Sequence, residues 1–221
     1  MDKQFFGLVD RYISDLLLPH DPILEDTIKS IENAGLPPIS VSANQGRLLQ
    51  ILVLLCRANR ILELGTLGGY STICMARALP EEGKLISLEF DPLCAEVAQK
   101  NINLAGQGNK VEIRVGKAIE LLPQILENNE GPFDLIFIDA DKPPYAEYFE
   151  YAVKLSRPGT LIICDNVIRE GKVLDPLCDD ELVQGVQRFN MALSKDQRVA
   201  ATIFQTIGAK DHDGIALAVV K

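Results

Sequence analysis

The sequence contains no tryptophan and only two histidines, His20 and His212. Catalytic triads and most transition-metal sites depend on imidazole side chains, so this scarcity argues against both. The five cysteines include no C-x-x-C pair, and most of them stand inside apolar stretches such as 54–56 and 163–164. This pattern favours buried free thiols in a reducing compartment over disulfides or a zinc site.

Long apolar runs are also missing. No stretch approaches the length that spans a bilayer, and the first residues lack the basic-then-apolar pattern of a signal peptide. The net charge of −9 argues against binding nucleic acid through bulk electrostatics. We therefore expect a cytoplasmic protein without membrane or nucleic-acid partners. Its 221 residues, 47% of them hydrophobic, are enough for one substantial core, so a single domain over 1–221 is expected.

The first quarter of the chain has the pattern of helices. Apolar residues recur at helical spacing through 4–18. Asp21 followed by Pro22 is typical of an N-cap and a first-turn proline, and predicts a second helix. Ser42 is a candidate cap for a third helix. Together these signals predict an N-terminal helical attachment over 1–58.

From residue 59 onward, strand-like and helix-like segments alternate. The strand-like runs are 60–64, 84–89, 111–115, 134–139 and 160–164, and the helix-like segments are 70–79, 92–105, 117–128 and 143–156. This alternation is typical of βαβ units in a parallel sheet covered on both faces. After a helix near 181–194, strands at 199–206 and 214–220 are expected to form an antiparallel hairpin with its turn at 210–214. The prediction is a Rossmann-like α/β core over 59–221 with a mostly parallel, seven-stranded sheet.

A glycine-rich turn follows the first predicted strand. Gly65 and Gly69 there allow close approach of the backbone to a ligand, and the next helix offers its N-terminal N–H groups. The dinucleotide fingerprint G-x-G-x-x-G is absent from the chain, which disfavours an NAD-dependent oxidoreductase. Glu63, just before the first glycine, would repel a pyrophosphate and suits a cationic ligand.

The second predicted strand ends at Glu89, where an acidic side chain is placed to accept both hydroxyls of a ribose. The alternative is an ordinary solvated strand end, with Asp91 capping the next helix. Beside the glycine loop, the ribose role is favoured. An adenosine-like ligand that carries positive charge and no pyrophosphate fits S-adenosylmethionine.

Two later strands stop abruptly on oxygen-bearing side chains. Asp139 ends one apolar run, and Asp165 and Asn166 end the next. If these strands are parallel neighbours, their carboxyl ends face one crevice, and the three side chains offer hard oxygen ligands to a divalent cation beside Lys142. Such ligands favour Mg²⁺, with Mn²⁺ or Ca²⁺ as alternatives. The competing interpretation is solvated strand ends and a surface ion pair for Lys142.

With these motifs, residues 41–221 resemble the cation-dependent class I O-methyltransferases, the group that contains the catechol and caffeoyl-CoA enzymes. The matching motifs are Leu62-Glu63-Leu64-Gly65, Gly69-Tyr70-Ser71, the Glu89 strand end, the run from Phe133 to Lys142, Tyr145, and Asp165-Asn166-Val167. The Asp-Ala-Asp-Lys sequence at 139–142 is closer to the caffeoyl-CoA-like branch and its bacterial relatives. Two features depart from the family. Residues 169–180 differ from the plant pattern, and the tryptophans that shape the acceptor pocket in several relatives have no counterpart.

The resemblance implies a role for each matching residue. It implies cofactor binding by Val41, Glu63, Gly65, Thr66, Gly69, Tyr70, Ser71, Glu89, Ala118, Asp139 and Asp141, with Glu89 on the ribose and Ala118 by the adenine. It makes Asp139, Asp165 and Asn166 the metal ligands and gives Lys142 and Asp139 catalytic roles. By the same analogy a homodimer is expected. Tyr145 and Tyr148 are expected to pack on a helix face, and residues 169–180 form either a lid or an ordinary surface loop.

The implied reaction transfers a methyl group from S-adenosylmethionine to a hydroxyl of a catechol-like, phenolic small molecule. A free phenol, with a pKa of about 10, supplies little phenolate at neutral pH. A bound dication lowers the pKa of a coordinated hydroxyl, two adjacent hydroxyls can chelate it, and Lys142 can accept the phenolic proton. Two alternatives stay open: O-methylation of a hydroxylated tRNA uridine, which the acidic charge disfavours, and a non-catalytic nucleotide-binding module.

Overall fold

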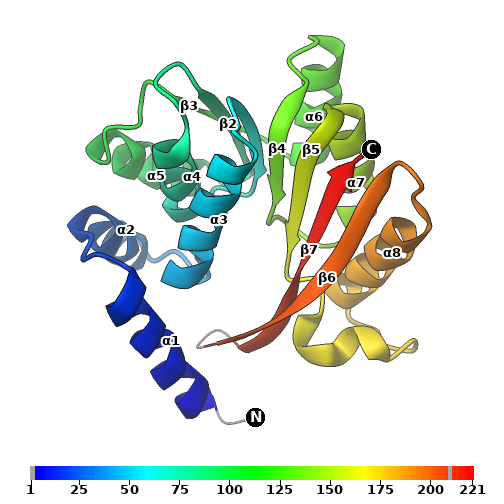
Figure 1. The fold of residues 1–221 in the computed structure, drawn as a ribbon, viewed down its shortest axis with the longest axis horizontal. Coiled ribbons are helices and arrows are strands. Elements are labelled where there is room, and N and C mark those ends of the chain that lie inside the picture. Colours follow the sequence, from blue (N-terminus) through cyan, green and yellow to red (C-terminus); the bar gives the residue numbers. More distant parts are fainter. Residues whose placement is uncertain (1–2, 209–210) are drawn as a thin grey trace.

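The computed structural model describes residues 3–208 and 211–221, and one mixed β-sheet forms its core (Figure 1). Among these residues seven strands pair in the order β3-β2-β1-β4-β5-β7-β6. The strands are β1 (Arg60–Leu64), β2 (Lys84–Glu89), β3 (Val111–Val115), β4 (Phe133–Ile138), β5 (Ser156–Asp165), β6 (Val199–Gly208) and β7 (Asp211–Val220). β1 to β5 pair in parallel, whereas β7 is antiparallel to both β5 and β6. The predicted Rossmann-like sheet with an antiparallel C-terminal hairpin is confirmed.

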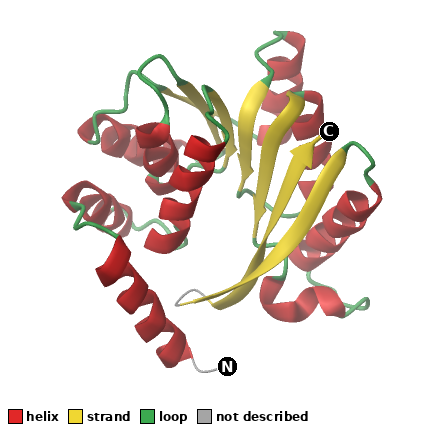
Figure 2. Cartoon of the chain, viewed as in Figure 1, coloured by secondary structure: helices red, strands yellow, loops and turns green. Residues whose placement is uncertain are grey.

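Helices cover both faces of this sheet (Figure 2). They are α1 (Lys3–Leu17), α2 (Pro22–Asn33), α3 (Ala43–Leu55), α4 (Tyr70–Ala78), α5 (Pro92–Leu104), α6 (Ala118–Glu127), α7 (Tyr145–Lys154) and α8 (Glu181–Lys195), with a 3-10 segment η1 (Arg169–Leu174). Side chains alternate along β4, so Leu135 and Phe137 join one buried cluster with α3, α4 and α5. Ile136 and Ile138 join the other cluster, with α6, α7 and α8. Burial on both faces explains why these strands read as continuous apolar runs.

The predicted N-terminal helices are present, and two of their start signals act as expected. Asp21 accepts a hydrogen bond from the N–H of Leu24 at 3.2 Å, and Pro22 occupies the first turn of α2. Ser42 and Gln45 form a reciprocal capping box at the start of α3. α1 projects from the body of the molecule toward the far end of the β6–β7 hairpin (Figure 1).

The strand order reverses between β1 and β4, and this reversal opens a crevice at the carboxyl ends of the strands. Leu64 at the end of β1 pairs with Leu88 on β2 and with Ile138 on β4. Ile138 pairs in turn with Cys164 on β5. The glycine loop, Glu89, Asp139 and Asp165 therefore follow or end four neighbouring strands at the same edge.

The expected turn at 210–214 is wrong. Asp211, Asp213 and Gly214 lie within β7 and pair with residues of β6 as far as Gly208; residue 210 lies outside the described residues. The side chain of Asp213 accepts backbone hydrogen bonds from the segment after β5, a tertiary contact that outweighs the turn preference of its residue type.

The cysteines behave as expected from their apolar surroundings. All five are free thiols, and Cys74, Cys94 and Cys164 are buried. No helix in the described ranges is both long and apolar enough to cross a membrane.

Candidate active site

The glycine loop after β1 approaches the end of β4 closely. Gly65 has a φ of +94°, and a Cβ at this position would collide with the backbone oxygen of Asp139. The N–H groups of Thr66 and Leu67 donate to one carboxylate oxygen of Glu89, at 3.0 and 2.8 Å. Glu89 is buried and lines the adjoining cavity, so it is not a solvated strand end. It holds the loop in place from β2.

Glu63 lies beneath this loop and not along the cavity. Its side chain is fully buried, and its carboxylate accepts hydrogen bonds from the hydroxyls of Ser71 (2.6 Å), Thr72 (2.5 Å) and Ser87 (2.7 Å). Burial raises its pKa to about 7, although the three hydroxyls oppose that shift. Glu63 was expected beside the cofactor; in the structure it reaches the cavity only through Ser71, which does line it.

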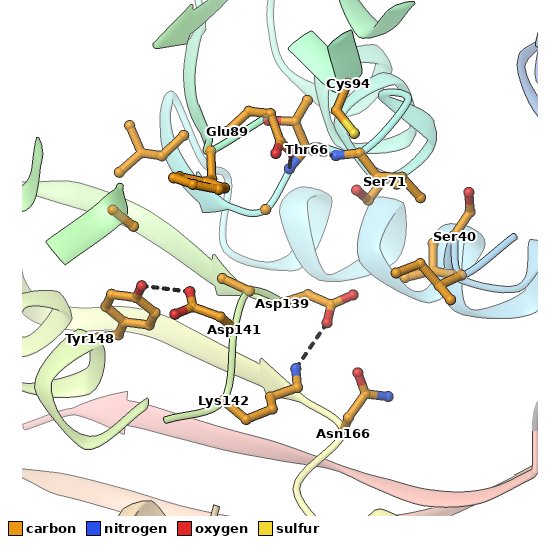
Figure 3. Close-up of a pocket in the computed structure, with 18 of the residues that line it drawn as sticks. Ser40, Thr66, Ser71, Glu89, Cys94, Asp139, Asp141, Lys142, Tyr148 and Asn166 are labelled. Carbon is orange, nitrogen blue, oxygen red and sulfur yellow. Dashed lines mark hydrogen bonds and ion pairs between the residues drawn. The ribbon is translucent and has the colours of Figure 1, made fainter. Parts of the chain in front are cut away.

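A large cavity of about 1050 Å³ opens above the carboxyl ends of the strands. Of the residues expected to bind the cofactor, it is lined by Val41, Gly65, Thr66, Tyr70, Ser71, Glu89, Ala118, Asp139 and Asp141. The remaining expected residue, Gly69, does not line the cavity; it is the N-cap of α4 and has a φ of +86°. Figure 3 shows Glu89, Thr66 and Ser71 on one side of the space, facing Asp139, Asp141 and Lys142 on the other.

A second cavity of about 360 Å³ adjoins the first. The two share six lining residues: Ile39, Ser40, Val41, Asp139, Asn166 and Asp213. Asp165 lines the smaller cavity only. The candidate metal ligands thus stand at the boundary between two compartments, a placement that suits a reaction between two bound molecules.

Lys142 is buried, lines the large cavity and uses all three of its N–H donors. Its Nζ lies 3.1 Å from Oδ1 of Asp139, 2.7 Å from the hydroxyl of Tyr145 and 3.1 Å from the backbone oxygen of Asp165. Three acceptors therefore surround this nitrogen. The alternative of a surface ion pair is wrong, because the side chain is only 8% exposed.

The donor set fits a hard cation. Asp139 and Asp165 follow and end paired neighbouring strands, and burial together with the charge of Asp139 raises the pKa of Asp165. A cation bound here would favour the ionised form of Asp165. With the amide oxygen of Asn166 the two carboxylates offer hard oxygen ligands. In the described ranges no group of three or more His, Cys, Asp or Glu gathers as a metal site.

The sequence did not predict that Tyr145 and Tyr148 contribute hydrogen bonds to the site, because the helical pattern indicates only that their rings are packed. The rings of Tyr145 and Tyr148 pack on a helix face as expected, Tyr145 against Phe189. Their hydroxyls, however, join the site: Tyr145 binds Lys142, and Tyr148 donates to Asp141 at 2.7 Å (Figure 3). An aromatic residue at helical spacing gives no signal for a hydrogen bond at its far end.

The segment after Asn166 borders the large cavity. Arg169 and Glu170 line it, and η1 begins there with three successive residues at positive φ. This position fits a lid as well as a surface loop, and closing of the segment stays a prediction.

The fold and this site define a class I methyltransferase architecture, and comparison with known proteins agrees. The family model described as O-methyltransferase matches residues 16–221. A catechol O-methyltransferase from Niastella koreensis is 60% identical over 221 residues, covering 100% of both chains. The structure of an O-methyltransferase from Bacillus cereus in complex with SAH has a TM-score of 0.97 at 47% identity, covering 99% of this chain and 100% of that one.

A third relative is the O-methyltransferase TomG from Streptomyces achromogenes, solved in complex with SAM, with a TM-score of 0.96 at 44% identity. The match covers 100% of this chain and 99% of that one. The chain belongs to the O-methyltransferase family. This confirms the predicted family and enzyme class, and sets aside the non-catalytic nucleotide-binding module.

Proposed function

We propose that this enzyme methylates one hydroxyl of a catechol-like small molecule with S-adenosylmethionine as donor and a divalent cation at Asp139, Asp165 and Asn166. The donor is supported by related structures that hold SAH or SAM, and the acceptor by the catechol O-methyltransferase relative. The observation that carries the proposal is the position of Asp139 and Asn166 on the wall common to both cavities. We take 59–221 as the cofactor- and metal-binding core of a single domain.

The large cavity is assigned to the methyl donor. Glu89 receives the ribose hydroxyls beside the backbone N–H groups of Thr66, Leu67 and Asp91, and Ala118 borders the adenine. Ser71 and Val41 face the amino-acid end of the donor, with Ser71 oriented by its hydrogen bond to Glu63. On the opposite wall, Asp141 is held by the hydroxyl of Tyr148.

The small cavity is assigned to the acceptor. At about 360 Å³ it lies within the usual range of ligand sites, and it combines apolar walls such as Leu48 and Ile215 with polar groups such as Gln205. Mg²⁺, or Mn²⁺ or Ca²⁺ in its place, would be held by Asp139, Asp165 and Asn166, where it lowers the pKa of a coordinated hydroxyl and fixes its position.

Lys142 is assigned the role of general base. A neutral lysine amine keeps two N–H donors and presents one lone pair. Nζ can therefore hold two of its three present partners and accept the phenolic proton with the remaining position. Asp139 then stabilises the ammonium that forms.

We also propose a homodimer. Large apolar side chains are exposed on α1 and on the two elements it contacts, α3 and β6. They are Phe5, Leu8, Tyr12, Leu16 and Leu17 on α1, Ile51, Leu54 and Leu55 on α3, and Phe204 and Ile207 on β6. Apolar surface of this extent favours association with another chain. Light scattering coupled to size exclusion should give about twice the monomer mass of 24.3 kDa.

The direct test is methyl transfer to catechol, to phenol and to tRNA, measured by mass spectrometry with and without EDTA. We expect methoxyphenol from catechol, its loss in EDTA, and its return when excess Mg²⁺ is added. Transfer to phenol should be far slower, because one hydroxyl cannot chelate. Undiminished transfer in EDTA would contradict the metal role, and transfer to tRNA but to no vicinal diol would favour the tRNA alternative.

A further inference from the structure

The segment that carries Asn166 has an unusual backbone. Asn166, Arg169 and Glu170 have φ values of 63°, 53° and 59°, in the left-handed region that non-glycine residues rarely adopt. Such residues persist only where the surrounding structure holds them there. Because Asn166 is a proposed metal ligand, the contacts that hold this segment also fix an oxygen of the cation site.

Asp213 on β7 holds this segment through one oxygen atom. Its Oδ1 accepts the N–H groups of Ile168 and Arg169, each at 2.9 Å, and that of Gly214 at 2.8 Å. Three donors converging on one carboxylate oxygen are charge-assisted hydrogen bonds, which are stronger than bonds between neutral groups. The carboxylate thus fixes the two peptide units that follow Val167.

Neighbouring contacts tie the same segment to β7 on both sides of Asn166. Before it, Asp165 pairs with Ile215 across the sheet. After it, the N–H of Val167 donates to the backbone oxygen of Gly214 at 3.0 Å. A Cβ at Gly214 would collide with the side chain of Ile168, so only glycine permits this approach.

We propose that Asp213 is a positioning residue for the cation site. Its carboxylate holds the strained segment so that the side chain of Asn166 stays beside Asp139 and Asp165. The inference rests on the proposed function, because it takes these three side chains as the metal ligands. It also assigns the β6–β7 hairpin a part in metal binding, although none of the three proposed ligands lies on it.

The test measures Mn²⁺ affinity by electron paramagnetic resonance in the wild type and in Asp213→Ala and Asp213→Asn. Asp213→Ala should weaken Mn²⁺ binding about tenfold or more, because an unheld ligand loses its orientation. Asp213→Asn keeps an amide oxygen that accepts the same N–H groups, so its affinity should stay within about threefold of the wild type. The dissociation constant of SAH, measured without metal by calorimetry, should change less than about twofold in both variants.

Asp180→Ala is the matched control. Oδ1 of Asp180 also accepts a backbone N–H, that of Leu182 at 2.9 Å, and it caps α8, but Asp180 lines neither cavity. This variant should lower thermal stability without changing Mn²⁺ affinity. Wild-type affinity in Asp213→Ala, or equal loss in Asp213→Asn and Asp213→Ala, would overturn the positioning role alone. Failure of the wild type to bind Mn²⁺ would overturn the proposed function, and this inference with it.

Discussion

The amino group of Lys142 lies 2.7 Å from the hydroxyl of Tyr145, and that hydroxyl lies 2.8 Å from the backbone oxygen of Asp165. Both side chains are buried, so bulk water does not compete for these contacts. The pair links the candidate base on the β4–α7 connection to the strand end that carries a candidate metal ligand. Its geometry leads to the first prediction.

Tyr145→Phe should impair catalysis more than cofactor binding. Loss of the hydroxyl removes one partner of Lys142 and leaves the buried carbonyl of Asp165 with fewer donors, at a cost of about 1–3 kcal/mol in unfolding free energy. We expect kcat to fall about tenfold with little change in the KM for S-adenosylmethionine. Steady-state kinetics and chemical denaturation measure both effects. Tyr151→Phe on the same helix should change neither, and an unaltered kcat in Tyr145→Phe would refute the proposed link.

Lys142→Ala should lower kcat about 100-fold or more, which is the usual contribution of a general base. Lys142→Arg keeps the positive charge beside Asp139 but cannot release a proton near neutral pH, so it should be nearly as slow. Calorimetry should show SAH binding within about twofold of the wild type in both variants. Recovery of most activity in Lys142→Arg would show that the residue acts through its charge and not as a base.

Asp165→Asn should remove the response of the enzyme to Mg²⁺ and reduce turnover to background, while SAH binding persists. Burial already raises the pKa of Asp165, so the neutral amide removes an unfavourable buried charge from the metal-free protein. Without metal at pH 8, the variant should therefore unfold at the same temperature as the wild type or at a higher one. Differential scanning fluorimetry with and without Mg²⁺ tests this, and stabilisation of the variant by Mg²⁺ equal to that of the wild type would exclude Asp165 as a ligand.

Glu63 should make the folded protein less stable as pH rises. Its pKa is about 7 in the folded state, against an ordinary value of 4.5. Between these values the unfolded chain releases a proton that the folded chain retains, so unfolding becomes more favourable with increasing pH. The loss begins above pH 4.5, is complete above pH 7 and amounts to about 3 kcal/mol.

Comparison with Glu63→Gln isolates this effect, because the amide does not titrate. Urea denaturation of both proteins at pH 5 and pH 8 should show the wild type losing stability relative to the variant at the higher pH. Parallel pH dependence of the two proteins would mean that Glu63 is ionised throughout this range.

The sequence predicted the sheet because its central strands are buried on both faces. Runs such as Leu135–Ile138 admit few other structures when helical segments separate them. Local signals also sufficed at Asp21 and Ser42, where the capping partner lies three residues away. The predicted position of the hairpin turn was wrong because Asp213 binds Ile168 and Arg169, which precede it by 45 and 44 residues.

The same limit applies within the site. The strand-end pattern identified Asp139, Asp165 and Asn166, since paired parallel strands bring their carboxyl ends together. It could not show that the side chain of Glu63, on β1, lies beneath the loop and accepts hydrogen bonds from Thr72 and Ser87, because those partners are brought to it only by tertiary packing. Hydrophobic periodicity predicts that a side chain is buried, but it does not predict the hydrogen-bond partner of a hydroxyl group at its end.

The most direct measurement of the central claim is the anomalous diffraction of Mn²⁺ in crystals grown with SAH and a catechol. The proposed function predicts one strong peak bounded by the side-chain oxygens of Asp139, Asp165 and Asn166, with both catechol oxygens on the ion and SAH in the large cavity. A catechol bound away from the ion, or no Mn²⁺ between these three side chains, would contradict it.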